Sequence, residues 1–518
     1  MSRQIHILWT DDEIDLLKPY ILFLEERDYR VTTAANGADA LHLVENNDFD
    51  LIFLDENMPG ISGLETLERI KSISPSTPVV MITKSEEEDI MDEALGSKIS
   101  DYLIKPVNPK QIILTIKKNI DTKRLVTEKT TSSYQSQFGQ IGMQINSASS
   151  FSDWTGIYSR LVFWEQAFDT SGGGGMEEVL SMQKTEANNE FARYVSKNYK
   201  NWFSGEGSDQ PLLSPGVFRS KVFPLLDQGK VMVVLIDNLR FDQWKIIEQE
   251  MNDLYRCDEE IIFSSILPTA TQYARNAMFA GMMPGEIQRQ HPDLWIDEND
   301  EGGKNAHEEE LCRIQMQKLG IGASFNYEKI SNQRAGKKLV ENYRDLLNYD
   351  LNVVVYNFVD MLSHARTEME MIRELAYDES SYRSLVKSWF QHSYLYDLLR
   401  QLNQHDIRLI ITTDHGAIRV NNPVKVIGDR KTSVNLRYKQ GRNLNYNKKE
   451  VFEVLQPEQV HLPRTNLTSS YIFARNNDFL VYPNNYNHFV NLYRNTFQHG
   501  GISMEEMLIP LSVLSPVR

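Results

Sequence analysis

Short apolar runs that stop at an acidic residue recur along this chain. They read HILWTDD at 6–12, LIFLD at 51–55, VMVVLID at 231–237 and LIITTDH at 409–415. Such runs predict β-strands that are buried on both faces of a sheet. In open α/β sheets, the residues that follow parallel strands gather at one edge, where ligands bind. The pattern therefore predicts α/β domains whose polar sites lie at strand ends.

Length and cysteine content narrow the class of protein. At 518 residues the chain exceeds one ordinary domain, and 41% hydrophobic residues permit real cores. The cysteines are Cys257 and Cys312, without a C-x-x-C pair, which argues against a disulfide framework or a thiolate zinc site. The first residues lack the apolar region of a signal peptide, and no apolar run reaches membrane-spanning length. We therefore expect a soluble, cytoplasmic, multidomain protein.

The charge balance disfavours nucleic-acid binding through a broad basic surface. The formal net charge is −16 at pH 7, and an acidic surface repels the phosphate backbone. A local basic groove is still compatible with this balance. The sequence that follows residue 120 shows no basic recognition helix, so we do not expect a DNA-binding domain.

The first 120 residues alternate strands and amphipathic helices. The pattern predicts helices over 14–26 and 38–46, one between residues 84 and 100, and one after Pro109. It predicts strands over 4–9, 29–35, 51–55, 78–83 and 100–106. This alternation is typical of a doubly wound, five-stranded parallel sheet.

Polar residues follow these strands in order. Asp11 and Asp12 follow the first strand, Asp55 ends the third, Thr83 the fourth and Lys105 the fifth. Three carboxylates can hold Mg²⁺, which prefers oxygen ligands. Lys105 and Thr83 can meet a phosphoryl group on Asp55. Each of the five is an ordinary strand-end residue by itself, but the ordered set predicts a site.

These motifs resemble the CheY-like receiver domains of two-component response regulators. The resemblance covers residues 1–122 and implies that Asp55 accepts a phosphoryl group from a sensor histidine kinase. It places Mg²⁺ on Asp11, Asp12, Asp55 and the backbone carbonyl of Asn57, and it makes Lys105 the phosphate contact. Thr83 and Tyr102 would form the switch pair, although Tyr102 also fits a plain strand aromatic. Phosphorylation is expected to expose a self-complementary face and produce a two-fold dimer.

A helical linker module is expected over residues 123–205. Residues 157–168 and 176–203 both carry apolar and aromatic side chains at helical spacing, and SGGGG at 171–175 separates them. We interpret the aromatic stripes as core rather than as a ligand site. The sequence leaves open whether this module relays a signal or only spaces two domains.

The rest of the chain, residues 206–518, holds several fragments with metal-ligand chemistry. Each joins a strand end or a helix start to acidic, imidazole or hydroxyl side chains. They supply Asp237, Thr271, Asp360, His364, Asp414, His415 and His499. Asp360 and His364 are four residues apart, which places both on one helical face. Three carboxylates, three imidazoles and one hydroxyl suit Zn²⁺, and six protein ligands are enough for two ions.

The order of these residues resembles the alkaline-phosphatase superfamily, and the motifs IDNLRFD and HGGISMEE point to its PglZ-type domain. The resemblance covers residues 206–518. It implies one zinc ion held by Asp360, His364 and His499, and a second held by Asp237, Asp414 and His415. Thr271 would be the nucleophile and would be ligated to the second zinc, with Thr269 as the alternative.

Three more residues near these motifs have expected roles. Arg275 lies one helical turn after Thr271, so it would either contact a substrate phosphate or form a surface salt bridge. Glu505 and Glu506 belong to the PglZ-type motif, and we expect them to serve the local fold.

A receiver joined to a PglZ-type domain resembles the PorX-type response regulators. That resemblance implies control of type IX secretion, with links to an alternative sigma factor and a secretion component. The expected activity is a zinc-dependent phosphohydrolase that forms a phosphothreonine at Thr271. Threonine nucleophiles recur in phosphodiesterase branches of the superfamily, so we expect a diester, such as a cyclic or linear oligonucleotide. The alternative is a regulatory adaptor that binds a sigma factor or secretion component without catalysis.

Overall fold

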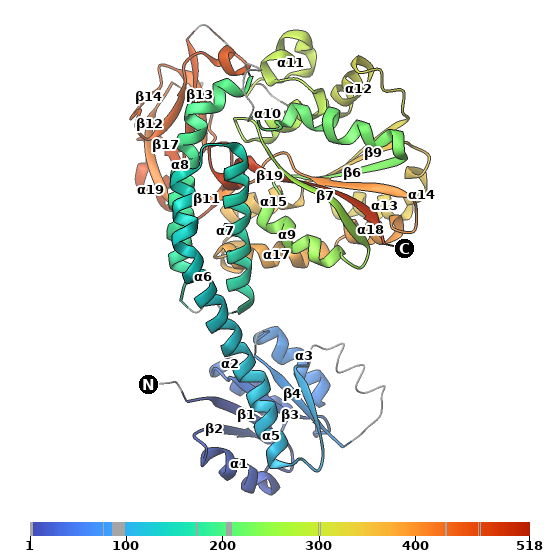
Figure 1. Ribbon diagram of the computed structural model, residues 1–518, viewed down its shortest axis with the longest axis vertical. Helices are drawn as coiled ribbons and strands as arrows, with labels where there is room; N and C mark the ends of the chain where they lie inside the picture. The colour runs from blue at the N-terminus through green and yellow to red at the C-terminus, as the bar shows by residue number, and fades with distance from the viewer. Residues whose placement is uncertain are drawn as a thin grey trace. The chain divides into compact units, whose positions relative to one another are not determined.

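The computed structural model of the chain describes residues 4–75, 77–84, 99–171, 175–203, 210–298, 300, 302–429, 432–464, 466 and 468–517. The chain divides into two compact units (Figure 1). The first unit holds Met1–Tyr134 and Thr170–Gly174, and the second holds Gln135–Asp169 and Gly175–Arg518. Among the described helices, none combines the length and the apolar composition that a bilayer crossing requires.

A five-stranded parallel sheet forms the centre of the first unit, with the order β2–β1–β3–β4–β5. The strands are β1 (His6–Thr10), β2 (Arg30–Ala34), β3 (Leu51–Asp55), β4 (Val79–Thr83) and β5 (Asp101–Ile104). Every residue of β1, β3 and β4 is buried, as expected for central strands that helices cover on both faces. Strand order and direction confirm the predicted doubly wound sheet.

Four described helices cover this sheet. Those on one face are α2 (Gly37–Asn46) and α3 (Gly63–Ile73), and those on the other are α1 (Lys18–Glu25) and α5 (Pro109–Ile116). The helix predicted over 14–26 begins later, because a 3-10 turn precedes Pro19 in the first turn of α1. No helix was predicted where α3 lies. The helix predicted between 84 and 100 falls on residues 85–98, outside the described part of the chain.

Long helices follow the first sheet. They are α6 (Thr122–Ser147), α7 (Phe151–Ser171) and α8 (Glu177–Asn198), and α8 continues into a 3-10 turn at Tyr199–Phe203. No proline interrupts the sequence between Pro109 and Pro211, so no missing backbone N–H breaks these helices. In the second unit, Trp154 of α7 packs on Phe191 of α8 with ring centroids 5.5 Å apart. The aromatic stripes therefore form core, apart from Phe163, which is 60% exposed.

The second unit is built on a six-stranded sheet with the order β7–β19–β10–β6–β9–β8. The strands are β6 (Lys230–Ile236), β7 (Tyr255–Ser264), β8 (Phe325–Ile330), β9 (Leu351–Tyr356), β10 (Ile407–Thr412) and β19 (Leu508–Pro516). β10, β6, β9 and β8 run parallel, whereas β19 is antiparallel to β10 and β7. This sheet confirms the large α/β domain that the sequence predicts.

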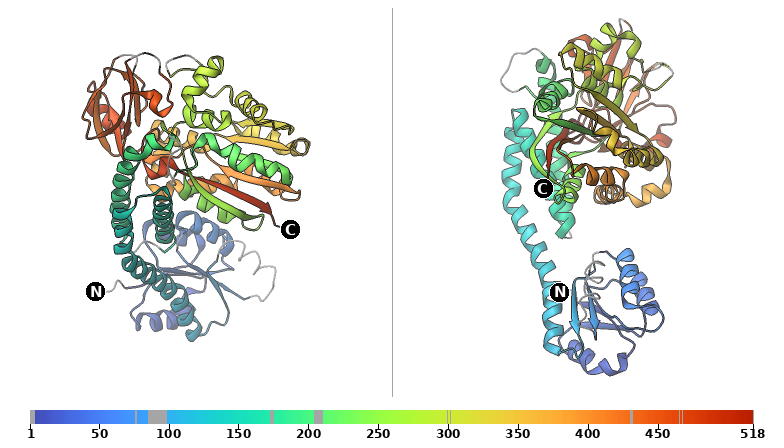
Figure 2. Two further views of the ribbon diagram at one scale, coloured as in Figure 1. Left: turned by 45° about the horizontal axis from the view of Figure 1, so that its top comes forward. Right: turned by 90° about the vertical axis from the view of Figure 1, so that its right-hand side faces the viewer.

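Helices lie on both faces of the large sheet (Figures 1 and 2). On one face are α10 (Thr271–Ala280) and α12 (Glu308–Lys318), and on the other are α9 (Phe241–Met251) and α17 (Glu379–Gln391). The remaining helices are α11 (Pro284–Gln290), α13 (Gln333–Glu341), α14 (Tyr343–Leu346), α15 (Phe358–Glu368), α16 (Glu370–Leu375), α18 (Tyr394–Leu402), α19 (Tyr486–Tyr493) and α20 (Met504–Met507).

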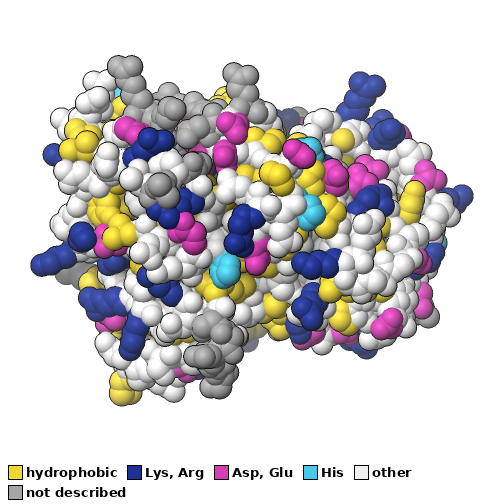
Figure 3. Space-filling model, turned by 90° about the horizontal axis from the view of Figure 1, so that it is seen from above, with side chains coloured by type: hydrophobic (Ala, Val, Ile, Leu, Met, Phe, Trp, Pro, Cys, Tyr) yellow, Lys and Arg dark blue, Asp and Glu magenta, His cyan; other side chains and the backbone are white. Residues whose placement is uncertain are grey.

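Smaller sheets are formed by the segment between β10 and β19. Their orders are β11–β18, β14–β12–β17 and β13–β16–β15. The strands are β11 (Ile418–Arg419), β12 (Asn422–Ile427), β13 (Tyr438–Arg442), β14 (Asn445–Tyr446), β15 (Val451–Val454), β16 (Ser469–Ala474), β17 (Asp478–Val481) and β18 (Phe497–Gln498). Figure 3 shows acidic and basic side chains interspersed on the face that it displays.

A buried lysine lies in β13. Lys439 is 1% exposed, and its ammonium group donates to the carbonyl of Ser433 at 3.1 Å and lies 4.4 Å from the ring centroid of Tyr482. Burial lowers the pKa of Lys439 to about 7, while the nearby carboxylate of Glu298 opposes that shift. The folded chain therefore releases this proton at a lower pH than the unfolded chain does.

We predict that Lys439→Met stabilises the protein at pH 7 and below. Above pH 7 and up to about 10.4, the unfolded chain keeps a proton that folded Lys439 has lost, so wild-type stability rises with pH by at most about 1.4 kcal/mol per unit. The variant should lack that rise. Thermal unfolding between about pH 6 and pH 10 measures the effect. Lys337→Met, at a side chain that is 61% exposed, is the control. An unchanged pH profile in Lys439→Met would contradict the effect of burial.

Candidate metal centre

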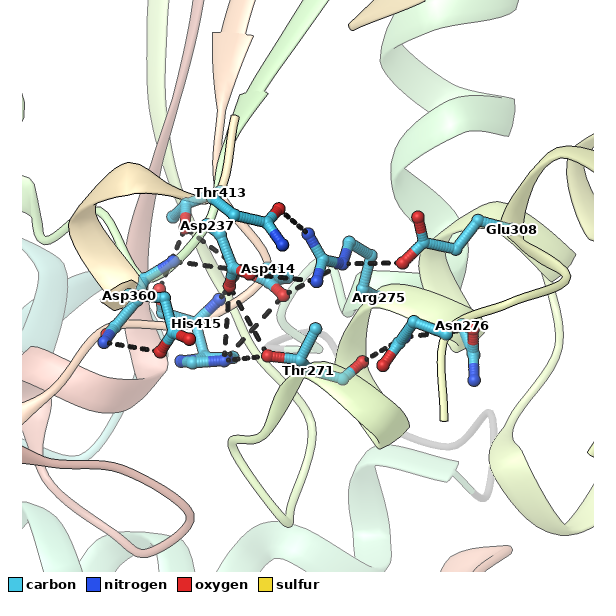
Figure 4. A network of polar contacts seen from close by, with 12 residues as sticks. Asp237, Thr271, Arg275, Asn276, Glu308, Asp360, Thr413, Asp414 and His415 are labelled. Atoms are coloured by element: carbon cyan, nitrogen blue, oxygen red, sulfur yellow. Dashed lines mark hydrogen bonds and ion pairs between the residues drawn. The ribbon is translucent and has the colours of Figure 1, made fainter. Parts of the chain in front are cut away.

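Three neighbouring parallel strands bring the candidate carboxylate ligands together. β10, β6 and β9 are adjacent and run in the same direction. Asp237 follows β6 directly, Asp414 follows β10 by two residues, and Asp360 lies in the first turn of α15 after β9. The three side chains therefore meet at the carboxyl edge of the sheet (Figure 4).

The ligand atoms form two groups of three. One group is Asp360, His364 and His499, and the other is Asp237, Asp414 and His415. Within each group, the ligand atoms all lie within 4.8 Å of one another. These are the two sets that the family resemblance implies, and the chain brings each set together from segments far apart in the sequence.

Distances within each group are close to those of a tetrahedral site. Oxygens of Asp360 lie 3.5 Å from Nε2 of His364 and 3.7 Å from Nε2 of His499. His415 Nε2 lies 3.9 Å from Asp237 Oδ1 and 3.8 Å from Asp414 Oδ2. Zinc bonds of about 2.0–2.2 Å separate tetrahedral ligands by about 3.3–3.6 Å, so small movements would let each group enclose one ion.

Backbone carbonyls orient two of the imidazoles. His415 Nδ1 lies 3.2 Å from the carbonyl oxygen of Gly416, and His499 Nδ1 lies 3.2 Å from that of Thr269. Each contact makes Nδ1–H the donor and leaves the Nε2 lone pair facing the other ligand atoms. The two rings stack with centroids 4.3 Å apart, so the two groups adjoin.

Asn238 links the two groups, and the sequence analysis missed it. Its backbone N–H donates to Asp414 Oδ1, and its side-chain amide donates to Asp360 Oδ1, both at 3.3 Å. A φ of 64° places Asn238 in the left-handed region, which asparagine tolerates better than most residues. Its position directly after Asp237 was the available signal, because asparagine favours such turns.

One carboxylate oxygen of the second group has no hydrogen-bond donor among the described residues. Asp414 is fully buried, and its Oδ1 accepts the N–H groups of Asn238 and His415. Its Oδ2 accepts no hydrogen bond and lies 3.5 Å from Nε of Arg275. A buried carboxylate oxygen without a donor is unfavourable, and a bound cation would compensate it.

Arg275 is 1% exposed, so the predicted alternative of a surface salt bridge is wrong. Its Nη2 lies 2.9 Å from Asp237 Oδ2 and its Nε lies 3.0 Å from Glu308 Oε1. Glu308 is also buried, accepts from Tyr327 and Lys329, and was not predicted as a site residue. Arg275 therefore compensates carboxylates of the site, and its contact with a substrate phosphate stays a prediction.

Thr271, and not Thr269, has its hydroxyl among the ligand atoms. Thr271 is the first residue of α10, and its Oγ1 lies 3.0 Å from His415 Nε2 and 3.4 Å from Asp237 Oδ1. Thr269 is fully buried. Its Oγ1 donates to the carbonyl of Gly501 and accepts the N–H of Gly500, both at 3.0 Å. That hydroxyl is therefore used to hold the loop after His499.

Burial shifts the titration of the site. It raises the pKa of Asp237, even though Arg275 attracts the charged form. Burial also acts on Asp414, but His415, Arg275 and backbone N–H groups hold the pKa of this carboxyl below its usual range. Burial and the neighbouring His415 lower the pKa of His499 to about 3. This imidazole is therefore neutral at pH 7, and its Nε2 lone pair is available to bind a metal ion.

A cavity of about 560 Å³ opens beside the site. Its lining includes Asp237, Thr271, Asp360, Lys304, Asn305 and Lys329. Asn305, another residue that the sequence analysis missed, donates to the backbone carbonyl of Thr271 at 2.9 Å. Thr271 and two lysines therefore line the same cavity.

Glu506 serves the local fold, as expected from the motif. It is fully buried and forms a bidentate ion pair with Arg437, with distances of 3.0 Å and 2.6 Å. Its Oε1 also accepts the N–H of Gly501 at 2.8 Å. These contacts fix the loop that follows His499.

The first unit gathers a second acidic site at the carboxyl edge of its own sheet. Oxygens of Asp11, Asp12 and Asp55 lie within 4.8 Å of one another. Lys105 Nζ lies 2.8 Å from both Asp11 Oδ2 and Asp55 Oδ1. Burial raises the pKa of Asp55 although Lys105 attracts its charged form. A cation beside these carboxylates would favour that charged form further.

The structure also describes three other residues of the first unit that the sequence predicts to act at this site. The Thr83 hydroxyl donates to the carboxylate of Glu56, which neighbours Asp55. Tyr102 of β5 is 41% exposed, which is compatible both with a switch residue and with a plain strand aromatic. Asn57 is exposed in the loop after β3. Their roles as switch pair and metal ligand stay predictions.

Family comparisons match three successive parts of the chain. The family described as "BREX system PglZ alkaline phosphatase-like domain" matches residues 217–514, which is more than half of the chain. The chain belongs to this PglZ family. Before the PglZ domain, residues 124–203 match "PorX response regulator linker domain" and residues 7–117 match "Response regulator receiver domain". This order confirms the predicted PorX-type architecture.

Shorter matches connect this PglZ protein to response regulators. It is 37% identical over 141 residues to the transcriptional regulatory protein ZraR of Klebsiella oxytoca, which covers 27% of this chain and 32% of ZraR. It is 31% identical over 116 residues to the transcriptional regulatory protein ResD of Bacillus subtilis (strain 168), which covers 22% of this chain and 48% of ResD. The chain therefore spans only about a third to a half of these relatives.

A solved structure also matches. The CheY-like response regulator receiver domain protein from Methanospirillum hungatei JF-1 is 30% identical and covers 23% of this chain and 94% of its own, with a TM-score of 0.22.

We predict that Thr269→Val and Thr271→Val differ in their effect on stability. Thr269→Val leaves the buried N–H of Gly500 and carbonyl of Gly501 without their partner, so it should cost about 1–3 kcal/mol. Thr271 is only partly buried, and its replacement should cost less than about 1 kcal/mol. Urea unfolding of the metal-free variants measures the difference. An equal or larger loss in Thr271→Val would contradict the structural role of Thr269.

Proposed function

We propose that the PglZ domain is a zinc-dependent phosphohydrolase that prefers phosphodiesters, such as cyclic or linear oligonucleotides. The observation that carries the proposal is the position of the Thr271 hydroxyl, 3.0 Å from His415 Nε2 and 3.4 Å from Asp237 Oδ1. A hydroxyl beside two groups of metal-type donors is the arrangement that metal-assisted displacement at phosphorus requires.

The donor atoms fit zinc. Each group combines carboxylate oxygens with imidazole nitrogens, which zinc binds readily. The buried Asp414 Oδ2 without a donor and the two imidazoles oriented through Nδ1 support the same ion. The first ion would be held by Asp360, His364 and His499, and the second by Asp237, Thr271, Asp414 and His415. Bound zinc would polarise the phosphoryl group and lower the pKa of a nucleophilic hydroxyl.

The reaction follows from the position of Thr271. Its Oγ1 loses its proton and forms a bond to phosphorus, while the bond from phosphorus to the leaving oxygen breaks and that oxygen takes up a proton. On a diester, the covalent intermediate at Thr271 keeps the second ester group. Water then cleaves the bond from phosphorus to Thr271 Oγ1, which restores the hydroxyl and releases the remaining phosphate monoester. Because α10 begins at Thr271, its free backbone N–H groups and its dipole favour the negative charge of the phosphate.

Two features support a diester substrate. Threonine nucleophiles recur in the phosphodiesterase branches of the superfamily that the chain resembles. The cavity of about 560 Å³ beside Thr271 is lined by Lys304 and Lys329. The positive charge of Lys304 suits an additional phosphate group of an oligonucleotide, whereas Lys329 already pairs with Glu308 of the same wall.

The receiver domain implies a sensor kinase as a partner. We propose that Asp55 is the phosphoacceptor and that Mg²⁺ is held by Asp11, Asp12, Asp55 and the backbone carbonyl of Asn57. Phosphorylation would draw Thr83 from Glu56 to the phosphoryl group, reorient Tyr102 and expose a dimer face. Roles in type IX secretion, with an alternative sigma factor and a secretion component, follow from the PorX-type architecture alone.

We predict that the zinc-loaded protein hydrolyses a chromogenic phosphodiester faster than the matching monoester. Thr271→Val removes the nucleophile and Asp237→Ala removes a ligand, so each should lower turnover at least about 100-fold. Asp293→Ala, at an exposed aspartate, is the control and should keep wild-type turnover. Zinc content is measured alongside the rates. Diester turnover that survives in Thr271→Val would show that the nucleophile is another group.

The same assay separates catalysis from the adaptor alternative. If the wild-type protein binds two zinc ions per chain and turns over neither ester, the hydrolase proposal is contradicted for these substrates. Regulation by binding a protein partner would then be the better explanation. The two complete donor groups favour catalysis, because a purely structural zinc site keeps no ligand position for a hydroxyl such as that of Thr271.

We also predict that beryllium fluoride with Mg²⁺ converts the monomer into a dimer. Beryllium fluoride mimics a phosphoryl group on Asp55, and receivers in this state assemble through a two-fold face. Light scattering coupled to size exclusion measures the mass. Asp55→Asn should stay monomeric, whereas Asp48→Asn, at an exposed position, should dimerise like the wild type. An unchanged wild-type mass would contradict phosphorylation-dependent assembly.

A further inference from the structure

A buried lysine joins the linker helices to the end of the PglZ domain. Lys184 of α8 lies 2.9 Å from Glu165 Oε1 of α7 and 3.0 Å from Glu505 Oε1 of α20. The Lys184 side chain is 12% exposed, and those of Glu165 and Glu505 are 11% and 4% exposed. One buried ammonium group therefore compensates two carboxylates from different parts of the chain.

Asn188, one turn further along α8, holds the same glutamate. Its Nδ2 donates to Glu505 Oε2 at 2.9 Å, and its Oδ1 accepts the N–H of Met504 at 2.7 Å. Both carboxylate oxygens of Glu505 and the start of α20 are thus bound by α8. The position of α20 therefore depends on that helix.

The backbone of Glu505 packs against the turn that carries Asp414 and His415. A Cβ atom on Gly416 would lie 2.1 Å from the carbonyl oxygen of Glu505, so only glycine fits there. The N–H of Gly416 also donates to the carbonyl of Glu506 at 3.2 Å. A shift of α20 would therefore move the residue that follows two candidate metal ligands.

A second set of ion pairs joins α7 to the turn after β6. Arg383 of α17 lies 2.8 Å from Asp169 Oδ2 of α7 and 3.0 Å from Asp242 Oδ2. Asp242 in turn pairs with Arg240, and both side chains are fully buried. Arg240 lies three residues after Asp237, and its Cγ lies 3.3 Å from the position of a Cβ on Gly416. Both sets of contacts thus converge on Gly416.

We infer that α7 and α8 position the metal centre, with Lys184 and Asn188 acting through Glu505 and Gly416 on His415. A module that only spaced two domains would have no need for buried cations that each contact two carboxylates against the catalytic domain, because burying a charge is unfavourable unless it is paired. The inference rests on the proposed zinc centre for its effect on metal binding, whereas the contacts themselves hold without metal. It identifies positioning residues rather than catalytic residues.

The test uses Lys184→Met and Glu505→Gln in the full-length protein. Each should weaken zinc affinity by about 10-fold or more, as loss of support behind metal ligands does. Each should also speed hydrogen exchange of residues 412–418 in the metal-free chain and lower kcat more than it changes KM. Lys184→Arg should restore most of the wild-type behaviour. Lys221→Met, which breaks a pair with Glu259 outside this network, is the control and should change none of these.

The outcomes separate this inference from the proposed function. If a folded Lys184→Met or Glu505→Gln keeps wild-type zinc affinity and wild-type exchange at residues 412–418, the positioning role is overturned. Glu505→Gln keeps the shape of the side chain, so it provides the answer if Lys184→Met fails to fold. A wild-type protein that binds no zinc would contradict the proposed function, and the exchange rates of the metal-free variants would still decide the positioning role.

Discussion

Repulsion among closely spaced carboxylates is the constraint on which the PglZ domain depends. Asp237, Asp360 and Asp414 meet at one edge of the large sheet, where two like charges about 4 Å apart repel by roughly 4 kcal/mol at an effective dielectric constant of 20. Arg275 and the amide of Asn238 compensate part of this charge. Part of the negative charge stays uncompensated, because Asp414 Oδ2 accepts no hydrogen bond from the described residues. This remaining charge favours the binding of cations. Metal binding is therefore expected to stabilise the fold as well as to supply the chemistry.

Charged side chains are also closely packed around the turns that carry the candidate metal ligands. The ion pairs of Arg240, Arg383 and Lys184 are buried, and each cation contacts at least two carboxylates. These pairs connect α7, α8, α9, α17 and α20 around the turns that carry the ligands. The linker helices are thus part of the packing that orients the candidate site.

Residues that follow apolar strands could be identified from the sequence because strand ends and the i, i+4 spacing of Asp360 and His364 are local patterns. The supporting residues could not, because their roles arise from distant contacts. Asn188 and Glu505 are separated by 317 positions, and no local pattern pairs them. Arg275 was placed at the surface as an alternative because its burial depends on Glu308 of α12. Likewise α3 was missed, whereas every strand of the first sheet was found.

Buried ion pairs also limit how phosphorylation could act on the PglZ domain. Moving α8 by a few ångströms would separate Lys184 and Asn188 from Glu505 and leave that buried carboxylate without these two partners, and such a state is strongly unfavourable. The network therefore resists small displacements of α8. It keeps the helices in their present arrangement until several of these contacts break together. Gradual distortion of the metal ligands is the least favourable form of control in such a structure. Control by assembly of two chains or by access to the cavity beside Thr271 leaves the buried network intact, so it agrees better with the way these charges are held.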